Sequence, residues 1–250
     1  STYTTSIGCE YMYIRDNDVV NWLQHKIEEN KNSTVFTTEQ KKHMLSHLKQ
    51  AVGFEQFIHK KFIGQKRFSL EGVETLIPAM DAVIERGAEL GIREFIIGMP
   101  HRGRLNVLAN IMQKPFENIF SEFFGEGYDE SVALGDVKYH MGYSTSVKTD
   151  NGNEVKLNLV PNPSHLETVT PIAIGLARSR INHLYKKDFT KLAPIIIHGD
   201  AAIASQGVVY ETVQMSQLKG YRVGGSIHLI VNNQVGFTTN YIDARSSTYS

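Results

Sequence analysis

Two apolar runs in the last third of the chain, residues 194–198 and 226–231, are each followed by a polar cluster that contains a candidate metal ligand. Asp200 lies in the first cluster and Asn233 in the second. Continuous apolar runs of this length are typical of parallel strands that are covered on both faces. Ligands of parallel α/β sheets bind outside the carboxyl ends of the strands. If the two strands run parallel, Asp200 and Asn233 therefore project from the same edge of the sheet.

The residue types in these clusters suit a magnesium ion that carries a diphosphate. A carboxylate, an amide oxygen and a backbone carbonyl are hard oxygen ligands, which Mg²⁺ prefers. Gly199, Ala201 and Ala202 are small, so the backbone can approach a diphosphate closely, with the amides of the following helix turned towards it. Either cluster alone is more often a helix cap or a turn. Their occurrence together, one crossover apart, favours the metal site.

Histidine and arginine side chains add groups that can move protons and bind anions. His101 follows the apolar run at 94–98 and a proline, so we expect it at the carboxyl end of another strand, and His140 lies in a long Gly-rich segment. Histidine titrates near neutral pH, although a lone histidine is more often a structural hydrogen-bond partner. The guanidinium of Arg102 suits an oxyanion, either a diphosphate or a substrate carboxylate, and a surface ion pair is the competing interpretation.

The composition argues against several other classes of protein. The 250 residues include 26 basic and 26 acidic side chains without a Lys/Arg block, so nothing indicates binding to nucleic acid or to a membrane surface. No apolar run approaches the roughly 18 residues that a membrane helix needs. The single cysteine rules out an internal disulfide. The sequence has neither the Gly-Lys-Ser/Thr loop of a nucleoside-triphosphate hydrolase nor the His-Glu-x-x-His pattern of a zinc hydrolase.

The first third of the chain is predicted to be helical. We expect a short helix after Asp18, and a second helix that has Thr38 as its N-cap and ends near residues 64–66. The apolar face of the second helix is predicted from the spacing of five residues, Met44, Leu45, Leu48, Val52 and Phe57.

From residue 67 the pattern changes to alternating helices and strands, apart from residues 125–153, which are expected to be irregular. Strands are expected at 94–98, 155–160, 194–198 and 226–231. Helices are expected at 73–90, 104–113, 116–124 and 168–184, with one more through Val208, Met215 and Leu218 that ends near Gly220. The last strand, helix and strand form a parallel crossover unit. The predicted fold class is therefore α/β, a mainly parallel sheet flanked by helices (67–250), preceded by a helical segment (1–66).

The sequence Gly199-Asp200-Ala201, followed later by Asn232-Asn233, resembles the diphosphate-binding signature of thiamin-diphosphate enzymes. The resemblance implies the thiamin-diphosphate-binding fold, with Mg²⁺ held by Asp200, Asn233 and the carbonyl of Val235. In most of these enzymes the third residue of the first cluster is glycine. Ala201 departs from that pattern but matches one branch of the family.

That branch is the decarboxylase component of 2-oxoglutarate dehydrogenase, which the chain resembles over nearly its whole length. The similarity is spread over many separate segments, so chance agreement is negligible. These segments are residues 9–12, 66–72, 98–106, 135–142, 162–167 and 232–239.

The resemblance also implies roles for individual residues. His101 and His140 bind the carboxylates of the substrate and assist proton transfers during decarboxylation. Phe68 lines the substrate pocket, and Ser144 contacts the substrate or its loop. The residues implied to line the cofactor site, besides the three metal ligands, are Arg102, Ser164, Leu166, Ala201 and Ala202.

The implied activity is the oxidative decarboxylation of 2-oxoglutarate with thiamin diphosphate and Mg²⁺, followed by transfer of the succinyl group to a lipoylated succinyltransferase partner. In this family the enzyme is a homodimer, and a Glu from a second domain activates the cofactor. That domain is expected beyond residue 250. The sequence therefore predicts that the α/β domain is truncated at its C-terminal side and that the isolated chain is inactive.

Alternatives stay open at this point. A 2-oxoadipate-directed relative shares most of these motifs, although residues 139–143 resemble the 2-oxoglutarate branch. Another alternative is a fragment that folds, or packs against a partner, without turning over. The resemblance implies a bacterial cytoplasm or a mitochondrial matrix as the compartment, with the bacterial cytoplasm preferred.

Overall fold

The computed structural model describes residues 2–4, 7–124, 137–236 and 238–247. The chain divides into two compact units, Ser1–Leu45 and Ser46–Ser250. The larger unit begins inside the segment that the sequence assigns to the N-terminal helical part, and the domain boundary after residue 66 stays a prediction. None of the helices in the described ranges is both long enough and apolar enough to cross a membrane.

The first helix begins with a side-chain cap. α1 (Asn17–Glu29) follows Asp16, whose carboxylate accepts hydrogen bonds from the backbone N–H groups of Asp18 at 3.0 Å and Val19 at 3.3 Å. These bonds satisfy two of the donors that a helix N-terminus leaves without an intrahelical partner. α1 therefore starts close to the predicted position.

The predicted N-cap of the second helix is wrong by one residue. Thr38 is already helical in α2 (Thr38–Lys61), and Thr37 is the capping residue. The hydroxyl of Thr37 accepts a hydrogen bond from the N–H of Gln40 at 3.2 Å, and the side-chain oxygen of Gln40 accepts one from the N–H of Thr37 at 2.9 Å. The two residues form a reciprocal capping box.

The predicted apolar face of α2 is wrong for three of its five residues, whereas the other two, Met44 and Leu48, are half-buried. The buried residues are Ala51, Phe54, Glu55 and Ile58, whereas Leu45, Val52 and Phe57 are exposed. The carboxylate of Glu55 accepts hydrogen bonds from the N–H of Leu70 and the side-chain amide of Asn106, both at 3.1 Å. A buried carboxylate needs such donors, so the helix turns Glu55 inward at the expense of more apolar neighbours.

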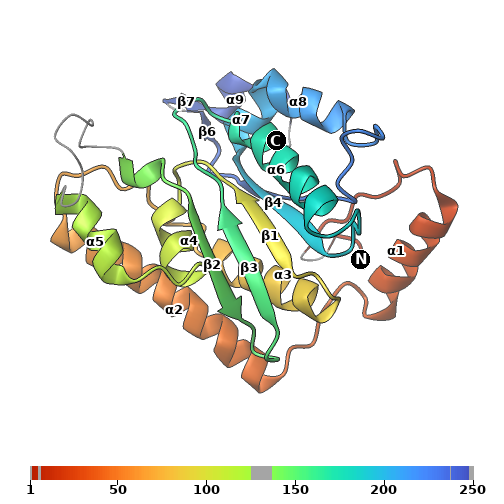
Figure 1. The fold of residues 1–250 in the computed structure, drawn as a ribbon, viewed down its shortest axis with the longest axis horizontal. Helices are drawn as coiled ribbons and strands as arrows, with labels where there is room; N and C mark the ends of the chain where they lie inside the picture. The colour runs from red at the N-terminus through yellow and green to blue at the C-terminus, as the bar shows by residue number, and fades with distance from the viewer. Residues whose placement is uncertain (1, 5–6, 125–136, 237, 248–250) are drawn as a thin grey trace. The chain divides into compact units, whose positions relative to one another are not determined.

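A five-stranded sheet of mainly parallel strands forms the centre of the larger unit (Figure 1). Its order is β2-β3-β1-β4-β5, and only β2 runs antiparallel to its neighbour. The strands are β1 (Glu94–Gly98), β2 (Tyr143–Lys148), β3 (Glu154–Leu159), β4 (Leu192–Gly199) and β5 (Ile227–Val231). The predicted α/β class and the parallel crossover from β4 to β5 are confirmed.

Strand β2 lies in the segment that was expected to be irregular, so that prediction is wrong for residues 143–148. Tyr143, Thr145 and Val147 alternate with more exposed residues along the strand, which is the period of a half-buried strand. The many Gly, Ser and Asp residues around it hide this short alternation. Residues 125–136, the first part of the segment that was expected to be irregular, lie outside the described residues.

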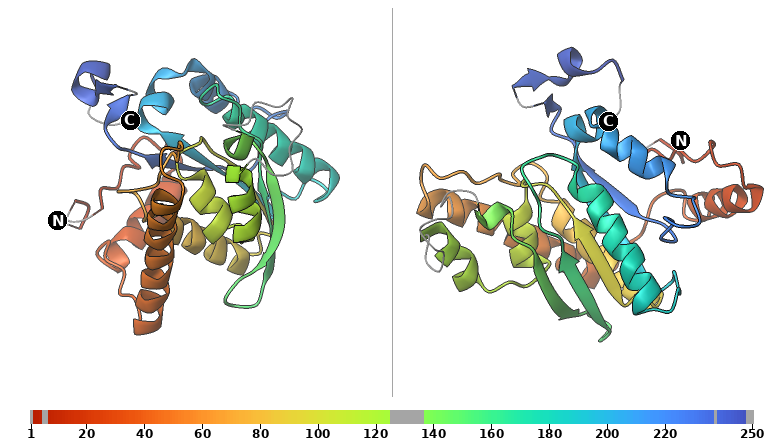
Figure 2. Two further views of the ribbon diagram at one scale, coloured as in Figure 1. Left: turned by 90° about the vertical axis from the view of Figure 1, so that its left-hand side faces the viewer. Right: turned by 45° about the horizontal axis from the view of Figure 1, so that its top comes forward.

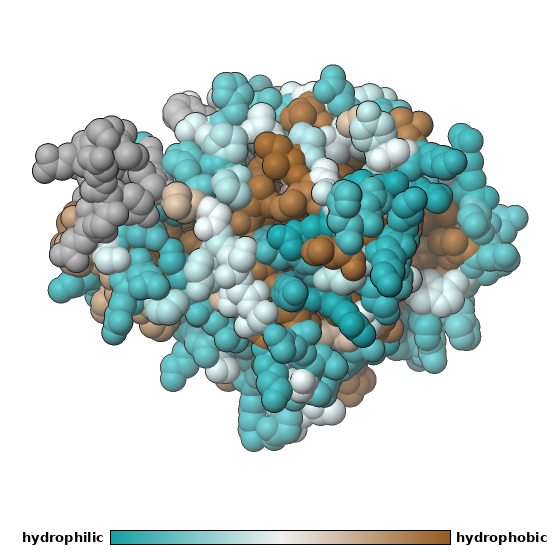
Figure 3. Space-filling model, in the orientation of Figure 1, coloured by the Kyte–Doolittle hydropathy of each residue, from teal (hydrophilic) through white to brown (hydrophobic). Residues whose placement is uncertain are grey.

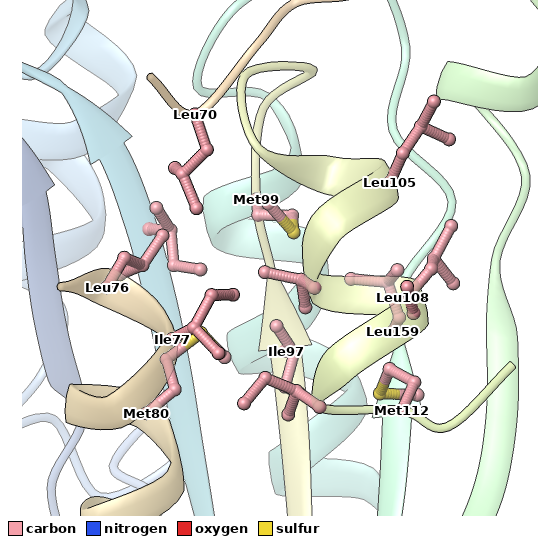
Figure 4. Close-up of a cluster of buried hydrophobic side chains, with 14 of the residues drawn as sticks. Leu70, Leu76, Ile77, Met80, Ile97, Met99, Leu105, Leu108, Met112 and Leu159 are labelled. Atoms are coloured by element: carbon pink, nitrogen blue, oxygen red, sulfur yellow. The ribbon is translucent and has the colours of Figure 1, made fainter. Parts of the chain in front are cut away.

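Helices cover both faces of the sheet (Figures 1 and 2). α6 (Val169–His183) packs Ala173, Ala177 and Ile181 against Ile96 and Ile196 of the sheet. Helices α3 (Leu76–Glu89) and α4 (Arg104–Asn110) cover the opposite face, and Figure 4 shows their side chains meeting Ile97 and Met99. Continuous burial of β1 on both faces accounts for its unbroken apolar sequence.

The remaining described elements are short, and one predicted helix ends earlier than expected. The helix predicted through Val208, Met215 and Leu218 is wrong at its C-terminal end, because α8 (Gly207–Gln214) stops before Met215. A separate helix, α7 (Asp200–Ser205), precedes α8, because Gln206 between them is extended, with φ −89° and ψ 110°. The others are α5 (Phe116–Phe124), the 3₁₀ turn η1 (Val137–Tyr139), the strand pair β6 (Val235–Gly236) and β7 (Thr239–Asn240), and α9 (Tyr241–Ala244). Apolar side chains reach the surface where Figure 1 draws α6 and α8, as Figure 3 shows.

A buried carboxylate at the start of β1 joins the sheet to the end of α6. Glu94 is 0% exposed, and one of its oxygens contacts Arg180 at 2.8 Å and accepts a hydrogen bond from Asn158 at 2.6 Å. Its other oxygen accepts the hydroxyl of Tyr185 at 2.8 Å. Burial, and then the neighbouring Glu94, raise the pKa of Tyr185 to about 12, so its hydroxyl keeps its proton as the donor.

Glu94→Gln should lower the free energy of unfolding by roughly 1–3 kcal/mol, because it leaves Arg180 without its carboxylate and puts an amide where three donors converge. Urea unfolding measures the change. The matched control is Glu89→Gln, which removes the exposed ion pair with Arg86 at 2.7 Å and should change the stability by less than about 0.5 kcal/mol. Equal unfolding midpoints for the two variants would contradict this role of Glu94.

Candidate functional site

The register of the parallel strands brings the ends of the expected site segments to one edge of the sheet. Gly98 of β1 pairs with Ile196 of β4, and Gly199 at the end of β4 pairs with Val231 at the end of β5. His101, Asp200 and Asn232 therefore all follow strands that finish at the same edge. This is the edge at which parallel α/β sheets bind ligands.

The two polar clusters after β4 and β5 lie directly against each other. Asp200 is the first residue of α7 and is 2% exposed. Gly236 of β6 approaches this helix so closely that a Cβ atom on it would lie 3.2 Å from the Cβ of Ala201. The side-chain oxygen of Asn233 accepts a hydrogen bond from the N–H of Val235 at 3.2 Å, which fixes the turn between them.

The donor set of these clusters fits Mg²⁺ in chemical type. It offers the carboxylate of Asp200, the side-chain amide oxygen of Asn233 and the backbone carbonyl of Val235, all hard oxygen donors. Asp200 already attracts a cation, since a guanidinium nitrogen of Arg245 lies 2.8 Å from its Oδ2. Sequence reasoning missed Arg245, because one arginine beyond the clusters gives no local signal of this contact.

The candidate histidines form an aromatic cluster with two other rings. The rings of His101 and His140 meet edge to face, with centroids 4.8 Å apart at 85°. Phe68 lies 5.2 Å from His101 and 4.9 Å from Tyr139, centroid to centroid. The structure thus brings together Phe68, His101 and His140, as expected, and adds the buried Tyr139, whose hydroxyl donates to the carbonyl of Lys66 at 2.7 Å.

Asn162, which sequence reasoning did not single out, orients both histidines. Its backbone carbonyl accepts a hydrogen bond from Nδ1 of His140 at 2.5 Å, so the Nε2 atom of neutral His140 carries the lone pair. Its side-chain amide nitrogen lies 3.4 Å from Nδ1 of His101, a contact that favours the tautomer with the proton on Nε2. The two imidazoles therefore present one acceptor and one donor. An asparagine two residues after the predicted strand 155–160 was the available signal.

Phe68 is held in a backbone conformation that few residues other than glycine adopt. Its φ is 44°, and its carbonyl accepts the N–H of Gly103 at 2.8 Å. Gly103 itself has φ 74°, and a Cβ atom on it would lie 2.6 Å from the side chain of Leu70. The guanidinium of Arg102, which is exposed, donates to the carbonyl of Ser69 at 3.1 Å. These contacts tie the segment around Phe68 to the segment around His101.

Ser164 and Leu166 lie in the exposed loop before α6, and the next residue, Glu167, fastens this loop to β4. One carboxylate oxygen of Glu167 accepts hydrogen bonds from Nδ1 of His198 at 2.7 Å and from the hydroxyl of Thr170 at 3.0 Å. His198 stands two residues before Asp200. The predicted cofactor residues of the loop and the predicted metal ligand are thus linked through a buried hydrogen bond between Glu167 and His198.

Ser144 lies in a different network. Its hydroxyl donates to the side-chain oxygen of Asn158 at 2.8 Å, and Asn158 in turn donates to Glu94. Within the described residues, this network connects Ser144 to Glu94 through Asn158 and includes neither His101 nor His140. Gly135 and Asp136, of the segment 135–142 that carries His140, lie outside the described residues, as does Phe237 of the segment 232–239.

The chain is an α/β protein whose acidic, amide and imidazole groups gather at the carboxyl edge of a mainly parallel sheet, where proteins of this class bind ligands. The sequence profile of the family described as Dehydrogenase E1 component matches residues 46–250, and the chain belongs to this family.

Curated relatives match nearly the whole chain. The 2-oxoglutarate dehydrogenase E1 component of Cupriavidus necator is 48% identical over 249 residues, which cover 99% of this chain and 26% of that protein. The proteins of the same name from Brucella canis and Brucella abortus are 48% identical over 259 residues, which again cover 99% of this chain and 26% of each relative. The chain therefore spans about a quarter of the length of the relatives that it matches.

A chain of hydrogen bonds runs from Glu167 to the edge strand β5. Nε2 of His198 accepts from Nδ1 of His228 at 2.8 Å, and Nε2 of His228 accepts the hydroxyl of Ser226 at 2.8 Å. Partial burial, and then His198, lower the pKa of His228 below its usual value of 6.5, although Glu167 opposes this. This direction of the bonds requires a neutral His228, because a protonated His228 would donate from Nε2 to the hydroxyl of Ser226 instead.

The stability of the protein should therefore fall in mild acid. Because the pKa of His228 is lower in the folded state, its contribution is fully present above the unfolded value of about 6.5 and is lost as the pH falls through the folded pKa. His228→Gln should flatten the dependence of the unfolding free energy on pH between about pH 7.5 and pH 5. The control His183→Gln changes an exposed histidine and should keep the wild-type slope. Parallel curves for wild type and His228→Gln would refute this prediction.

Proposed function

We propose that the chain is the Mg²⁺- and thiamin-diphosphate-binding part of a 2-oxoglutarate dehydrogenase decarboxylase component. Family membership and the names of the relatives support this function. The observation that carries it is the meeting of two clusters, the one that begins at Asp200 and the one that contains Asn233, at the carboxyl ends of adjacent parallel strands. Open α/β sheets bind ligands outside the carboxyl ends of their strands, which is where these two clusters lie.

In this proposal the metal is held by Asp200, Asn233 and the carbonyl of Val235. Arg245, which contacts Oδ2 of Asp200, would then compete with Mg²⁺ for the same carboxylate. The small side chains of Ala201 and Ala202 leave room for the diphosphate. Arg102 and the loop residues Ser164 and Leu166 complete the cofactor site. The arginine supplies charge, and the leucine, which is 45% exposed, supplies apolar surface.

When bound, thiamin diphosphate supplies a nucleophilic ring carbon and accepts the negative charge that remains after CO₂ leaves. The protein's own residues bind and orient the substrate. His101 presents an N–H at Nε2 that can donate to a carboxylate or keto oxygen, and His140 presents a lone pair at Nε2 that can accept a proton. Phe68 and Tyr139 supply an apolar wall that limits the access of water to these atoms. Ser144 stays a candidate contact to the substrate or its loop.

The whole protein's partners and compartment belong to the same proposal. The succinyl group passes to a lipoylated succinyltransferase component, and the complete polypeptide works as a homodimer. The bacterial origin of the relatives supports a bacterial cytoplasm over a mitochondrial matrix. The lipoylated partner, the homodimer and the compartment are all proposed from similarity to the family.

Asp200→Ala and Asn233→Ala should each weaken Mg²⁺-dependent binding of thiamin diphosphate at least about ten-fold, because each removes a hard oxygen ligand. Isothermal titration with and without Mg²⁺ measures the affinity. Asp150→Ala and Asn151→Ala are matched controls, since they remove the same groups from an exposed turn and should leave the affinity within about three-fold. Binding that is independent of Mg²⁺, or indifferent to both site variants, would show that the site assignment is wrong.

His101→Ala should lower kcat/KM for 2-oxoglutarate by about 10²–10⁴-fold in the complete polypeptide, because it removes a proton donor from the reacting atoms. The dissociation constant of thiamin diphosphate should change by less than about three-fold, since the histidine lies outside the metal cluster. Steady-state decarboxylation and a cofactor titration measure the two quantities. His183→Ala is the control. A loss of cofactor affinity as large as the loss of turnover would contradict a role in substrate chemistry.

A further inference from the structure

Arg104 is a charged side chain in the interior of the larger unit. It is 0% exposed and is the largest fully buried side chain among the described residues. Burial lowers its pKa to about 10, so it still carries its charge at neutral pH. It also occupies the first turn of α4, where the helix dipole disfavours a cation. Both features make this position costly for an arginine.

The side chain of Arg104 donates three hydrogen bonds, all to backbone carbonyl oxygens. One guanidinium nitrogen donates to Met99 at 3.3 Å, and the other donates to Met141 at 2.7 Å and to Val160 at 2.8 Å. The planar guanidinium can reach three carbonyls on three separate segments at once. These bonds satisfy backbone carbonyls that lie beyond the ends of the strands. The carbonyls are neutral, so they do not cancel the positive charge of the guanidinium.

Each of the three carbonyls belongs to a segment that carries or orients one of the two histidines. Met99 follows β1 and lies two residues before His101. Met141 is bonded directly to His140 in the chain. Val160 follows β3 and lies two residues before Asn162, which contacts both imidazoles. The guanidinium thus connects the three segments whose relative positions determine the distance between the imidazoles.

This arrangement explains why a costly buried charge occupies the position. An apolar side chain would pack there without a desolvation cost but would leave the three carbonyls without a donor. A lysine would keep the charge but has a flexible ammonium, which does not hold three carbonyls in one plane. A charged residue at a buried position where an apolar one would be more stable is expected where a functional site has to be held in a fixed geometry.

We propose that Arg104 is a positioning residue for the decarboxylation, acting through His101 and His140 without touching the substrate. The inference rests on the proposed function, in which these two histidines serve the substrate. It predicts that the geometry of the histidine pair, and not only the stability of the fold, depends on the guanidinium.

The test uses Arg104→Lys in the complete polypeptide, with kcat, KM and the dissociation constant of thiamin diphosphate measured for each variant. We expect kcat to fall at least about ten-fold, with the cofactor affinity within about three-fold of wild type. The control is Leu108→Ala, which truncates a buried apolar residue of the same helix and lowers the melting temperature without touching the carbonyls. A similar fall in kcat for Leu108→Ala would show a merely structural effect and overturn the proposal.

A double-mutant cycle distinguishes positioning from general destabilisation. If Arg104 acts through the histidines, Arg104→Lys should cost less than about three-fold in the background of His101→Ala with His140→Ala, because the groups that it positions are gone. The same ten-fold loss in that background would overturn the proposal. If Arg104→Lys does not fold, Asn162→Ser tests the next link, and an unchanged kcat there would overturn it as well.

The two hypotheses fail in different ways. A complete wild-type polypeptide without Mg²⁺- and thiamin-diphosphate-dependent turnover of 2-oxoglutarate would overturn the proposed function. A wild-type protein with this turnover, in which Arg104→Lys behaves like Leu108→Ala, would overturn only the positioning role. Loss of kcat that is not additive with the loss from the histidine variants supports both.

Discussion

The parallel pairing of β3, β1, β4 and β5 is the constraint on which the rest of the site depends. Parallel strands end at one edge, so the residues that follow them must converge there whatever their separation in the sequence. The pairing of Gly199 with Val231 puts the acidic and the amide clusters side by side. The ends of β1 and β3 bring the segments of His101 and Asn162 to the same place. The strands themselves contribute almost no polar side chain to the site.

Buried polar groups hold the loops that follow the strands in place. Glu55 holds the segment at Leu70 against α4, and Glu167 holds the loop before α6 against His198. Arg104 joins the segments beyond β1 and β3 to Met141. Each of these groups bonds to atoms far away in the sequence. The loops at this edge therefore owe their shape to long-range hydrogen bonds rather than to their own turn preferences.

The contrast between strands with a local sequence pattern and loops held by long-range hydrogen bonds explains which features the sequence could predict. Apolar runs identified β1, β3, β4 and β5, and the rule for strand ends put Asp200 and Asn233 at one edge. The inward turn of Glu55, the pairing of Asp200 with Arg245 and the double contact of Asn162 depend on partners that no local pattern reveals. Strand β2 and the break at Gln206 were missed because short polar alternation and a single extended residue give weak signals. Resemblance, not periodicity, pointed to His140 and Phe68.

The left-handed backbone of Phe68 has a consequence for how this protein can change over time. Its conformation is maintained by the N–H of Gly103, and Gly103 fits only because it has no side chain next to Leu70. A larger residue at position 103 would displace the backbone that holds Phe68, and relaxation of Phe68 would leave the Gly103 donor unpaired. The two positions are therefore coupled, and a substitution at position 103 is expected to change which residues position 68 tolerates.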